Sequence, residues 1–146
     1  MLKLSTKARY ASRIMVRLAM TSQNGPVRRH DIAKAEGLTP DYVEQILIKL
    51  KTAGLATSHR GAKGGYTMGK APEQITMAMI VEATDGPICL APCVKEHCDR
   101  ESMCVTQTVW KEASKAAQDV LDKAMLSDLV ADMHKLNKGP ALTFDI

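Results

Sequence analysis

A mainly helical fold with one small β-hairpin is predicted by three features of the 146-residue sequence. Aromatic residues make up only 3% of the chain, so the core must be built from aliphatic side chains and methionine. Apolar residues recur every three or four positions over most of the chain, which is the period of an amphipathic helix. Strand-like runs occur only at 55–60 and 66–68, on either side of a glycine-rich stretch.

The N-terminal segment is expected to form a helix from Lys7 to about Ser22, with Thr6 as its N-cap. The apolar face of this helix repeats at intervals of four residues and consists of Tyr10, Ile14 and Leu18. A basic stripe with the same spacing lies on another face and consists of Arg9, Arg13 and Arg17. Such a stripe can follow a phosphate backbone, whereas for Arg17 alone an ordinary solvated surface is the preferred interpretation.

Two shorter helices joined by a tight turn are predicted next. The first spans about 28–36 and ends at Gly37, and the second is capped by Thr39 with Pro40 at its first position. The second helix buries one stripe at helical spacing, formed by Val43, Ile46, Leu47 and Leu50. This is the pattern of a helix-turn-helix, whose second helix enters the major groove of DNA.

The outer face of the second helix carries the residues expected to read DNA, which are Tyr42, Gln45 and Lys49. Asp41 and Glu44 lie near the N-terminus of that helix, where Asp41 suits the helix dipole. Acidic side chains rarely face DNA unless they accept from a cytosine amine, so Glu44 is expected to add selectivity more than affinity. Arg28 and Arg29, at the start of the preceding helix, are further candidates for DNA contact.

The two strand-like runs predict a hairpin with a basic, glycine-rich tip. After a helix-turn-helix such a hairpin is a wing, and Arg60 and Lys63 could enter a minor groove or touch phosphate. A nucleotide-binding loop is discounted, because neither G-x-G-x-x-G nor G-x-x-x-x-G-K-[ST] is present and no βαβ pattern surrounds the loop. Residues 1–85 are therefore predicted to form a winged helix-turn-helix domain, whose last helix opens at 71–74.

Charge is distributed unevenly along the chain. Residues 1–70 hold 13 Lys and Arg against 4 Asp and Glu, a net charge of +9, whereas residues 71–146 hold 7 against 12, a net charge of −5. A basic half joined to an acidic half indicates a nucleic-acid surface on one side of the molecule. An ordinary solvated surface is the competing interpretation and stays open at this point.

All four cysteines lie within sixteen residues, at Cys89, Cys93, Cys98 and Cys104. Thiolates are good ligands for iron and zinc, and residues 86–104 are predicted to form a cysteine-rich loop that can close on one metal centre. Structural zinc sites usually contain tight C-x2-C pairs, which this sequence lacks, so zinc is the weaker metal candidate. Thiol–disulfide switching without a metal and buried free cysteines are competing interpretations of the same cluster.

The C-terminal part is predicted to be helical over 105–136, followed by a flexible tail at 137–146. A thin apolar seam recurs at helical spacing in this part and includes Val109, Trp110, Ala113, Ala116, Ala117, Val120 and Leu121. A long helix of this kind, with no obvious partner in so short a chain, indicates packing against a second subunit, so a homodimer is expected. Ser127 is expected to cap a last short helix.

Several functional classes are disfavoured by the sequence. No Ser-His-Asp set, paired-carboxylate site or nucleotide loop suggests an enzyme, and the apolar runs are too short to span a bilayer. The polar N-terminus lacks the apolar run of a signal peptide, so a cytoplasmic location is expected. An electron carrier built on the same cysteines is the competing class, but it needs neither a basic half nor a recognition helix.

The sequence resembles the IscR-type family of winged-helix transcriptional regulators over about residues 1–133. The resemblance rests on Leu4-Ser-Thr-Lys-Ala-Arg-Tyr10, Tyr42-Val-Glu-Gln45, the stretch 55–66, the late cysteines and Cys104-Val-Thr-Gln-Thr-Val-Trp110. It implies a homodimer that binds a palindromic operator in double-stranded DNA. It also places Arg60 at the minor groove. The residues implied at the major groove are Thr39, Asp41, Tyr42, Glu44 and Gln45. It also implies control of iron–sulphur assembly, sulphur or stress genes by an iron–sulphur cluster (2Fe–2S or 4Fe–4S) on Cys93, Cys98 and Cys104.

Two departures from the family pattern concern the ligands of this cluster. The first gap between the three cysteines holds four residues where the family commonly has five. Gln107, a poor iron ligand, stands where IscR-type members place a histidine. The candidates for the fourth ligand are, in order, Cys89, His97 and a residue of the partner's N-terminal helix, where this chain has Ala8 or Arg9. Cys89 would complete an all-thiolate site within one chain.

Overall fold

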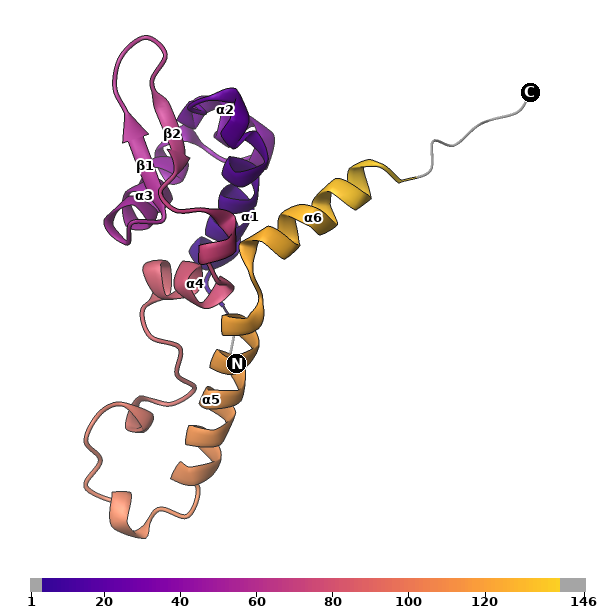
Figure 1. Cartoon of the computed structure of the whole chain (residues 1–146). Helices are drawn as coiled ribbons and strands as arrows, with labels where there is room; N and C mark the ends of the chain where they lie inside the picture. Colours follow the sequence, from indigo (N-terminus) through magenta and orange to yellow (C-terminus); the bar gives the residue numbers. More distant parts are fainter. Residues whose placement is uncertain (1–3, 140–146) are drawn as a thin grey trace.

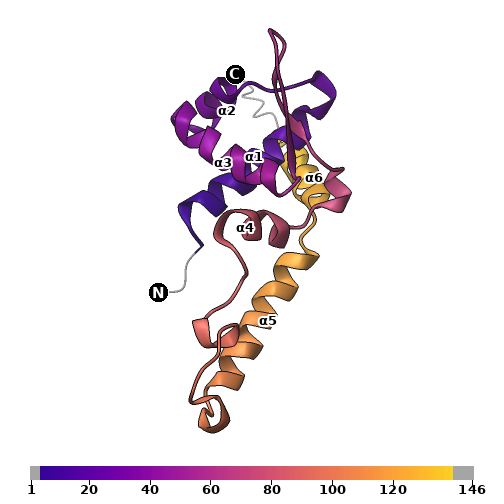
Figure 2. The same cartoon turned by 90° about the vertical axis from the view of Figure 1, so that its left-hand side faces the viewer.

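The computed structural model describes residues 4–139 and consists of a helical body and an arm (Figures 1 and 2). The hairpin lies along one side of the body, and the arm, formed by the cysteine loop and one long helix, extends away from it. The regular elements are α1 (Thr6–Thr21), α2 (Arg29–Glu36), α3 (Pro40–Thr52), β1 (Ala56–His59), β2 (Gly65–Met68), α4 (Met77–Asp85), α5 (Gln107–Lys123) and α6 (Leu126–Asn137). This order confirms the predicted mainly helical, winged helix-turn-helix fold.

Helix α1 begins one residue earlier than expected, because Ser5 and not Thr6 is its N-cap. Ser5 Oγ accepts a hydrogen bond from Ala8 N at 3.0 Å, which satisfies one of the free N–H groups of the first turn. The buried face of α1 consists of Ala8, Ala11, Ile14, Met15, Leu18 and Ala19. Helix α1 packs on α2, α3, α4 and α6, so it forms the centre of the body.

The helix-turn-helix forms as predicted. Gly37 has a left-handed φ of 67° at the end of α2, and Thr39 Oγ1 accepts from Tyr42 N at 3.3 Å to cap α3. Pro40 occupies the first position of α3, where its missing N–H costs nothing. All residues of the expected apolar stripe of α3 are fully buried, namely Val43, Ile46, Leu47 and Leu50.

The hairpin is fixed to the body by an isolated β-bridge to Val27, which no sequence pattern indicated. Strands β1 and β2 pair antiparallel, with Ala56 opposite Met68. Val27, just before α2, exchanges two backbone hydrogen bonds with Tyr66 of β2, at 2.9 and 2.8 Å. The base of the wing therefore moves with the start of the helix-turn-helix.

The prediction that a helix opens at 71–74 is wrong, because this stretch holds only a short 3₁₀ turn and α4 begins at Met77. The chain between them pairs with a distant segment. Ile75 O accepts from Leu126 N at 2.8 Å, and Met77 N donates to Ala124 O at 2.9 Å. A long-range backbone pairing thus overrides the local preference for an earlier helix start.

After α4 the chain leaves the body through the cysteine loop and returns along α5 (Figure 1). Helix α6 starts at Leu126 after Met125, so the prediction that Ser127 caps the last helix is wrong. Leu126 is fully buried in the core, and α6 packs on α1. Residues 140–146 of the expected flexible tail lie outside the described residues. No helix between residues 4 and 139 is both long and apolar enough to cross a membrane.

Candidate nucleic-acid interface and cysteine loop

The N-terminal end of α3 presents polar side chains to solvent. Thr39, Asp41 and Gln45 are exposed. Tyr42 is half-buried, because its ring meets that of Tyr10 in α1 edge to face, with ring centroids 6.2 Å apart. The position of Tyr42 therefore depends on α1 as well as on its own helix.

Two of the residues predicted to contact DNA pair with each other. Arg29 Nη1 of α2 donates to Glu44 Oε2 of α3 in an ion pair, and both side chains remain partly exposed. The pair links the two helices of the helix-turn-helix. It also balances the charge of Glu44, which would reduce the repulsion between this carboxylate and an approaching phosphate.

Two further predicted contacts are bonded to the fold. Arg28 Nη2 donates to Ala62 O at the tip of the wing, at 2.5 Å. Lys49 is half-buried, and its Nζ donates to Thr84 O in the last turn of α4, at 2.6 Å. The ammonium group of Lys49 therefore serves a contact between α3 and α4 in this structure.

Three of the predicted cations stay free at the surface. Arg9, Arg60 and Lys63 are exposed. Within residues 4–139, none of their side chains takes part in an ion pair or a hydrogen bond. Arg60 and Lys63 lie on the wing, in the turn between its strands, and can approach a phosphate or a groove without first breaking a contact.

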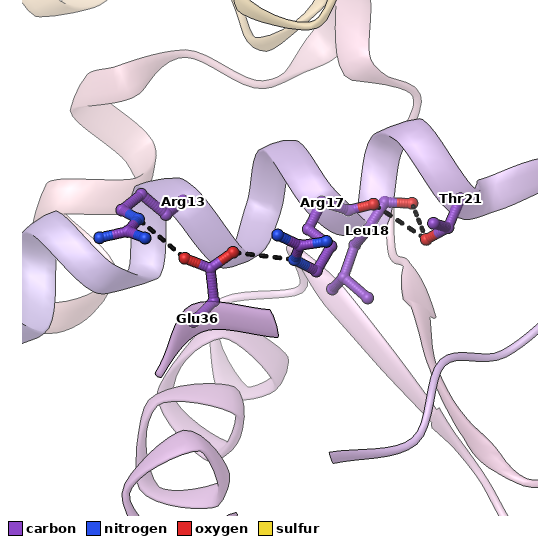
Figure 3. A network of polar contacts seen from close by, with 5 residues as sticks. All are labelled: Arg13, Arg17, Leu18, Thr21 and Glu36. Atoms are coloured by element: carbon purple, nitrogen blue, oxygen red, sulfur yellow. Dashed lines mark hydrogen bonds and ion pairs between the residues drawn. The ribbon is translucent and has the colours of Figure 1, made fainter. Parts of the chain in front are cut away.

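The basic stripe of α1 is divided by a buried carboxylate (Figure 3). Arg17 Nε donates to Glu36 Oε1 at 2.8 Å, and Arg13 Nε lies 2.7 Å from Glu36 Oε2. The side chain of Glu36 is only 4% exposed, whereas those of Arg13 and Arg17 are 59% and 37% exposed. These two arginines balance a charge inside the body, so Arg9 is the residue of the stripe that has no ionic partner among residues 4–139.

The four cysteines are free and half-buried. Cys89 Sγ donates to Ala91 O at 3.3 Å, and His97 is exposed beside Asp99. Over residues 4–139, no three His, Cys, Asp or Glu side chains are close enough to hold one metal ion. The donor types fit a thiolate-bound centre, but their arrangement in this conformation does not.

Two buried polar residues of α5, neither of which was predicted to be an anchor, hold the backbone of the cysteine loop. Gln107 Nε2 donates to Cys93 O at 2.8 Å, and Ser114 Oγ accepts from Leu90 N at 2.9 Å. Both anchor side chains are buried on a helix that is otherwise largely exposed. A buried polar residue of this kind gives no periodicity signal, although Gln107 stands out because IscR-type members have histidine there.

Hydrogen bonds around Cys104 favour the ionised form of its thiol. The hydrogen bond with Thr106 Oγ1, 3.4 Å away, lowers the pKa of the Cys104 thiol, and the backbone N–H groups of Gln107 and Thr106 lower it further. Each of these donors stabilises the thiolate more than the thiol. The Cys104 thiol is therefore more ready to react or to bind a metal than an ordinary cysteine thiol.

Helix α5 exposes a line of apolar side chains. Val109 is 54% exposed, Trp110 41% and Val120 67%. A groove of about 700 Å³ follows the same helix, lined by its apolar side chains and by the start of the cysteine loop, including Cys89. An apolar face this extensive is typical of a surface that another chain covers.

The chain is similar to known transcriptional regulators. Residues 4–132 match the Rrf2 family, described as an iron-dependent transcriptional regulator. The HTH-type transcriptional regulator IscR of Aliivibrio salmonicida is 37% identical over 132 residues, which cover 90% of this chain and 79% of that protein. The structure of CymR (YrzC), the global cysteine regulator of B. subtilis, matches with a TM-score of 0.77 and 37% identity over 90% of this chain and 98% of that one. The structure of T. potens IscR matches with a TM-score of 0.78 and 32% identity over 96% and 94%.

Proposed function

The chain belongs to the Rrf2 family of transcriptional regulators, and we propose that it is a cytoplasmic homodimer that binds a palindromic operator in double-stranded DNA. The main support is the exposed start of α3 beside a wing whose Arg60 and Lys63 are free of other partners within residues 4–139. In this proposal, Arg60 enters the minor groove, and Arg9 and Lys63 contact phosphates. The major groove is read by Thr39, Asp41, Tyr42, Glu44 and Gln45.

The homodimer is proposed from α5. Its exposed apolar line would be covered by the same helix of a second subunit, as a two-fold symmetric contact requires. A symmetric dimer presents two copies of α3 at a fixed spacing, and an operator with two half-sites matches that spacing. The distance between the two recognition helices then depends on how each arm joins its body.

We propose further that an iron–sulphur cluster controls DNA binding, held by Cys93, Cys98 and Cys104 with Cys89 as the fourth ligand. Four thiols in one loop and the iron-dependent description of the family support this proposal. Because the thiols are not gathered here, cluster binding would need the loop to rearrange. A coupling of about 1–3 kcal/mol would change DNA affinity about 5- to 150-fold. The genes proposed as targets serve iron–sulphur assembly, sulphur metabolism or stress.

A metal-free thiol switch is the second candidate. One observation favours it, the lowered pKa of the Cys104 thiol. The B. subtilis relative is described as a global cysteine regulator, which is consistent with thiol-based control in this family. Zinc on the same loop and an electron carrier are weaker candidates, and the basic N-terminal half argues against the carrier.

The experiment that tests the proposal combines metal analysis with DNA binding. Protein is purified without oxygen, and iron, acid-labile sulphide and zinc are measured in the wild type and in Cys89→Ala. Affinity for operator-sized DNA is then measured over a range of salt concentrations, with and without the metal centre. The expected result is iron and sulphide in the wild type, their loss in Cys89→Ala, and a steep salt dependence of DNA binding.

Three contrary results would each favour a different candidate. Tight DNA binding without iron, but sensitive to thiol oxidation, would favour the metal-free switch. One bound zinc per chain would favour a zinc-loaded regulator. Reversible cluster reduction without salt-dependent DNA binding would reject the regulator in favour of an electron carrier.

A further inference from the structure

The last turn of α4 contacts α3, the second helix of the helix-turn-helix and the proposed recognition helix. Thr84 is buried, and its carbonyl oxygen accepts a hydrogen bond from Lys49 Nζ at 2.6 Å. The final carbonyl groups of a helix have no partner within that helix and carry its partial negative charge. The ammonium group of Lys49 satisfies one of them, so the contact fixes α3 to the end of α4.

The next residue of the same turn contacts α1. Asp85 Oδ2 accepts from Ser5 N at 3.1 Å, and Asp85 Oδ1 accepts from Ser5 Oγ. Ser5 is the N-cap of α1, so the carboxylate lies at the positive end of that helix. Two consecutive residues, Thr84 and Asp85, therefore link α4 to the recognition helix and to the central helix of the body.

The cysteine loop starts directly from this turn. Gly86 ends α4 with a φ of 82°, and Cys89 follows three residues later. The hydrogen bonds that hold the loop elsewhere lead to α5 in the arm, through Gln107, Lys111 and Ser114. A displacement of the loop relative to the body therefore acts directly on the last turn of α4, and otherwise reaches the body only through α5.

We propose that the turn Thr84–Asp85 transmits the state of the cysteine loop to the DNA-binding elements, with Lys49 as the positioning residue for α3 and Asp85 as the positioning residue for α1. This inference rests on the proposed function, because it explains how the loop controls DNA binding. It also assigns Lys49 a role different from the DNA contact that the sequence suggested. If the turn shifts, Lys49 loses its carbonyl partner or moves the end of α3 with it.

A coupling between the cysteine loop and the DNA-binding elements is a property of the protein itself, and each of the two sites affects the other by the same free energy. The test therefore does not need DNA or a metal. Full-length, metal-free protein is prepared with its thiols reduced or alkylated by N-ethylmaleimide, which perturbs the loop directly. Amide hydrogen exchange is then followed in α1, α3 and α4.

The variants are chosen to separate the two links. Lys49→Met keeps the aliphatic stem and removes the ammonium group, and Lys51→Met is its control, since Lys51 lies in the same helix but contacts Ser58. Alkylation is expected to speed exchange in the last turn of α3 about fivefold or more in the wild type and Lys51→Met. Lys49→Met should show no such response in α3. Asp85→Ala should keep the α3 response and lose that of the first turn of α1.

An equal α3 response in Lys49→Met and the wild type would overturn the inference, as would a wild type in which alkylation changes nothing outside the arm. A second measurement uses DNA. In Lys49→Met, the slope of log DNA affinity against log salt should stay that of the wild type. The reduced and the alkylated forms of this variant should bind DNA with equal affinity. A slope reduced by about 0.9 would make Lys49 a phosphate contact and reject the positioning role. If alkylation changes exchange in α3 as expected but the protein does not bind DNA, the proposed function is rejected and the coupling through α4 stands.

Discussion

The side-chain amide of Gln107 donates a hydrogen bond to the backbone carbonyl of Cys93, 2.8 Å away. This contact fixes the first turn of α5 to the middle of the cysteine loop. It also directs Gln107 toward the backbone of a predicted ligand residue. The position that holds a histidine ligand in IscR-type members is therefore occupied here by a residue that anchors the loop.

Gln107→Ala should loosen the loop without removing a metal ligand. The Cys93 carbonyl would lose its donor, so stability should fall by about 1 kcal/mol and alkylation of Cys93 should become faster. Iron content after anaerobic purification should stay near that of the wild type. Peptide mapping of alkylated cysteines and iron analysis check both parts. Complete loss of iron in Gln107→Ala, with normal folding, would contradict this prediction.

Thr106→Val should raise the pKa of Cys104, because it removes the hydroxyl that contributes most to lowering it. The thiolate is the reactive form, and a lowered pKa leaves more thiolate at neutral pH. In metal-free protein the alkylation rate of Cys104 should therefore fall as the pH drops through this lowered pKa. In Thr106→Val the fall should occur at higher pH. Iodoacetamide labelling across a pH series measures this, with Cys98 as the internal reference, and identical profiles would disprove it.

Glu36→Gln should destabilise the body by about 1–3 kcal/mol, because the buried carboxylate loses its charge-assisted hydrogen bond from Arg17 and its ion pair with Arg13. The loss stays moderate since both arginines are partly exposed and can be rehydrated. Asp132→Asn is a matched control, because its partner Lys135 is exposed and the pair should contribute less than about 1 kcal/mol. Urea unfolding followed by circular dichroism provides the comparison. Equal losses in the two variants would count against a structural role for Glu36.

Gly65→Ala should disturb the attachment of the wing. A Cβ atom at Gly65 would lie 2.5 Å from Val27 O, in a backbone with φ of +154°. Gly61→Ala is the control, since it also has positive φ but would meet no atom within 4 Å. Backbone strain of about 1–3 kcal/mol applies to both variants, and only Gly65→Ala must also displace Val27. Unfolding midpoints and DNA affinity should therefore fall further in Gly65→Ala, and a more severe loss in Gly61→Ala would reverse this ranking.

Arg60→Gln should weaken DNA binding and reduce its salt dependence. One cation fewer on the phosphate backbone or in the minor groove lowers the slope of log affinity against log salt by about 0.9. Lys115→Gln in α5 is a suitable control, because Lys115 is paired with Asp119 on the arm. Fluorescence anisotropy at several salt concentrations measures both variants. Unchanged affinity and slope in Arg60→Gln would remove the wing from the proposed interface.

Most parts of the fold that depend on local sequence were predicted well, although the N-cap of α1 is Ser5 and not Thr6. The left-handed turn at Gly37 and the cap at Thr39 require particular residues, and the α3 stripe has a clear period, so each could be identified from the chain. The start of α4 and the cap of α6 were predicted wrongly, because both depend on pairing between residues around Ile75 and Leu126. Contacts between segments fifty residues apart leave no mark on local periodicity.

In the candidate site, too, local features were predicted from the sequence and long-range contacts were not. Residue types and spacing indicated which cations could contact DNA and which thiols could bind a metal. They did not indicate which of these side chains bond to other parts of the chain. Lys49, Arg28 and Arg29 are bonded to Thr84, Ala62 and Glu44, and a sequence pattern cannot reveal such partners. Arg60 and Lys63 remain free among the described residues because the tip of a hairpin has few neighbours.

The pairing of the chain around Ile75 with the chain around Leu126 makes the arm an insertion into an otherwise continuous body. The two ends of this insertion are fixed by a single helix, α4, which is about 13 Å long at about 1.5 Å per residue. The entropy of closing such a loop grows slowly with its length, by about 0.6 kcal/mol for each doubling. The cysteine loop can therefore gain or lose residues between its cysteines while the body keeps its core. A four-residue gap in place of a five-residue gap changes which ligands can meet, but it places little demand on folding.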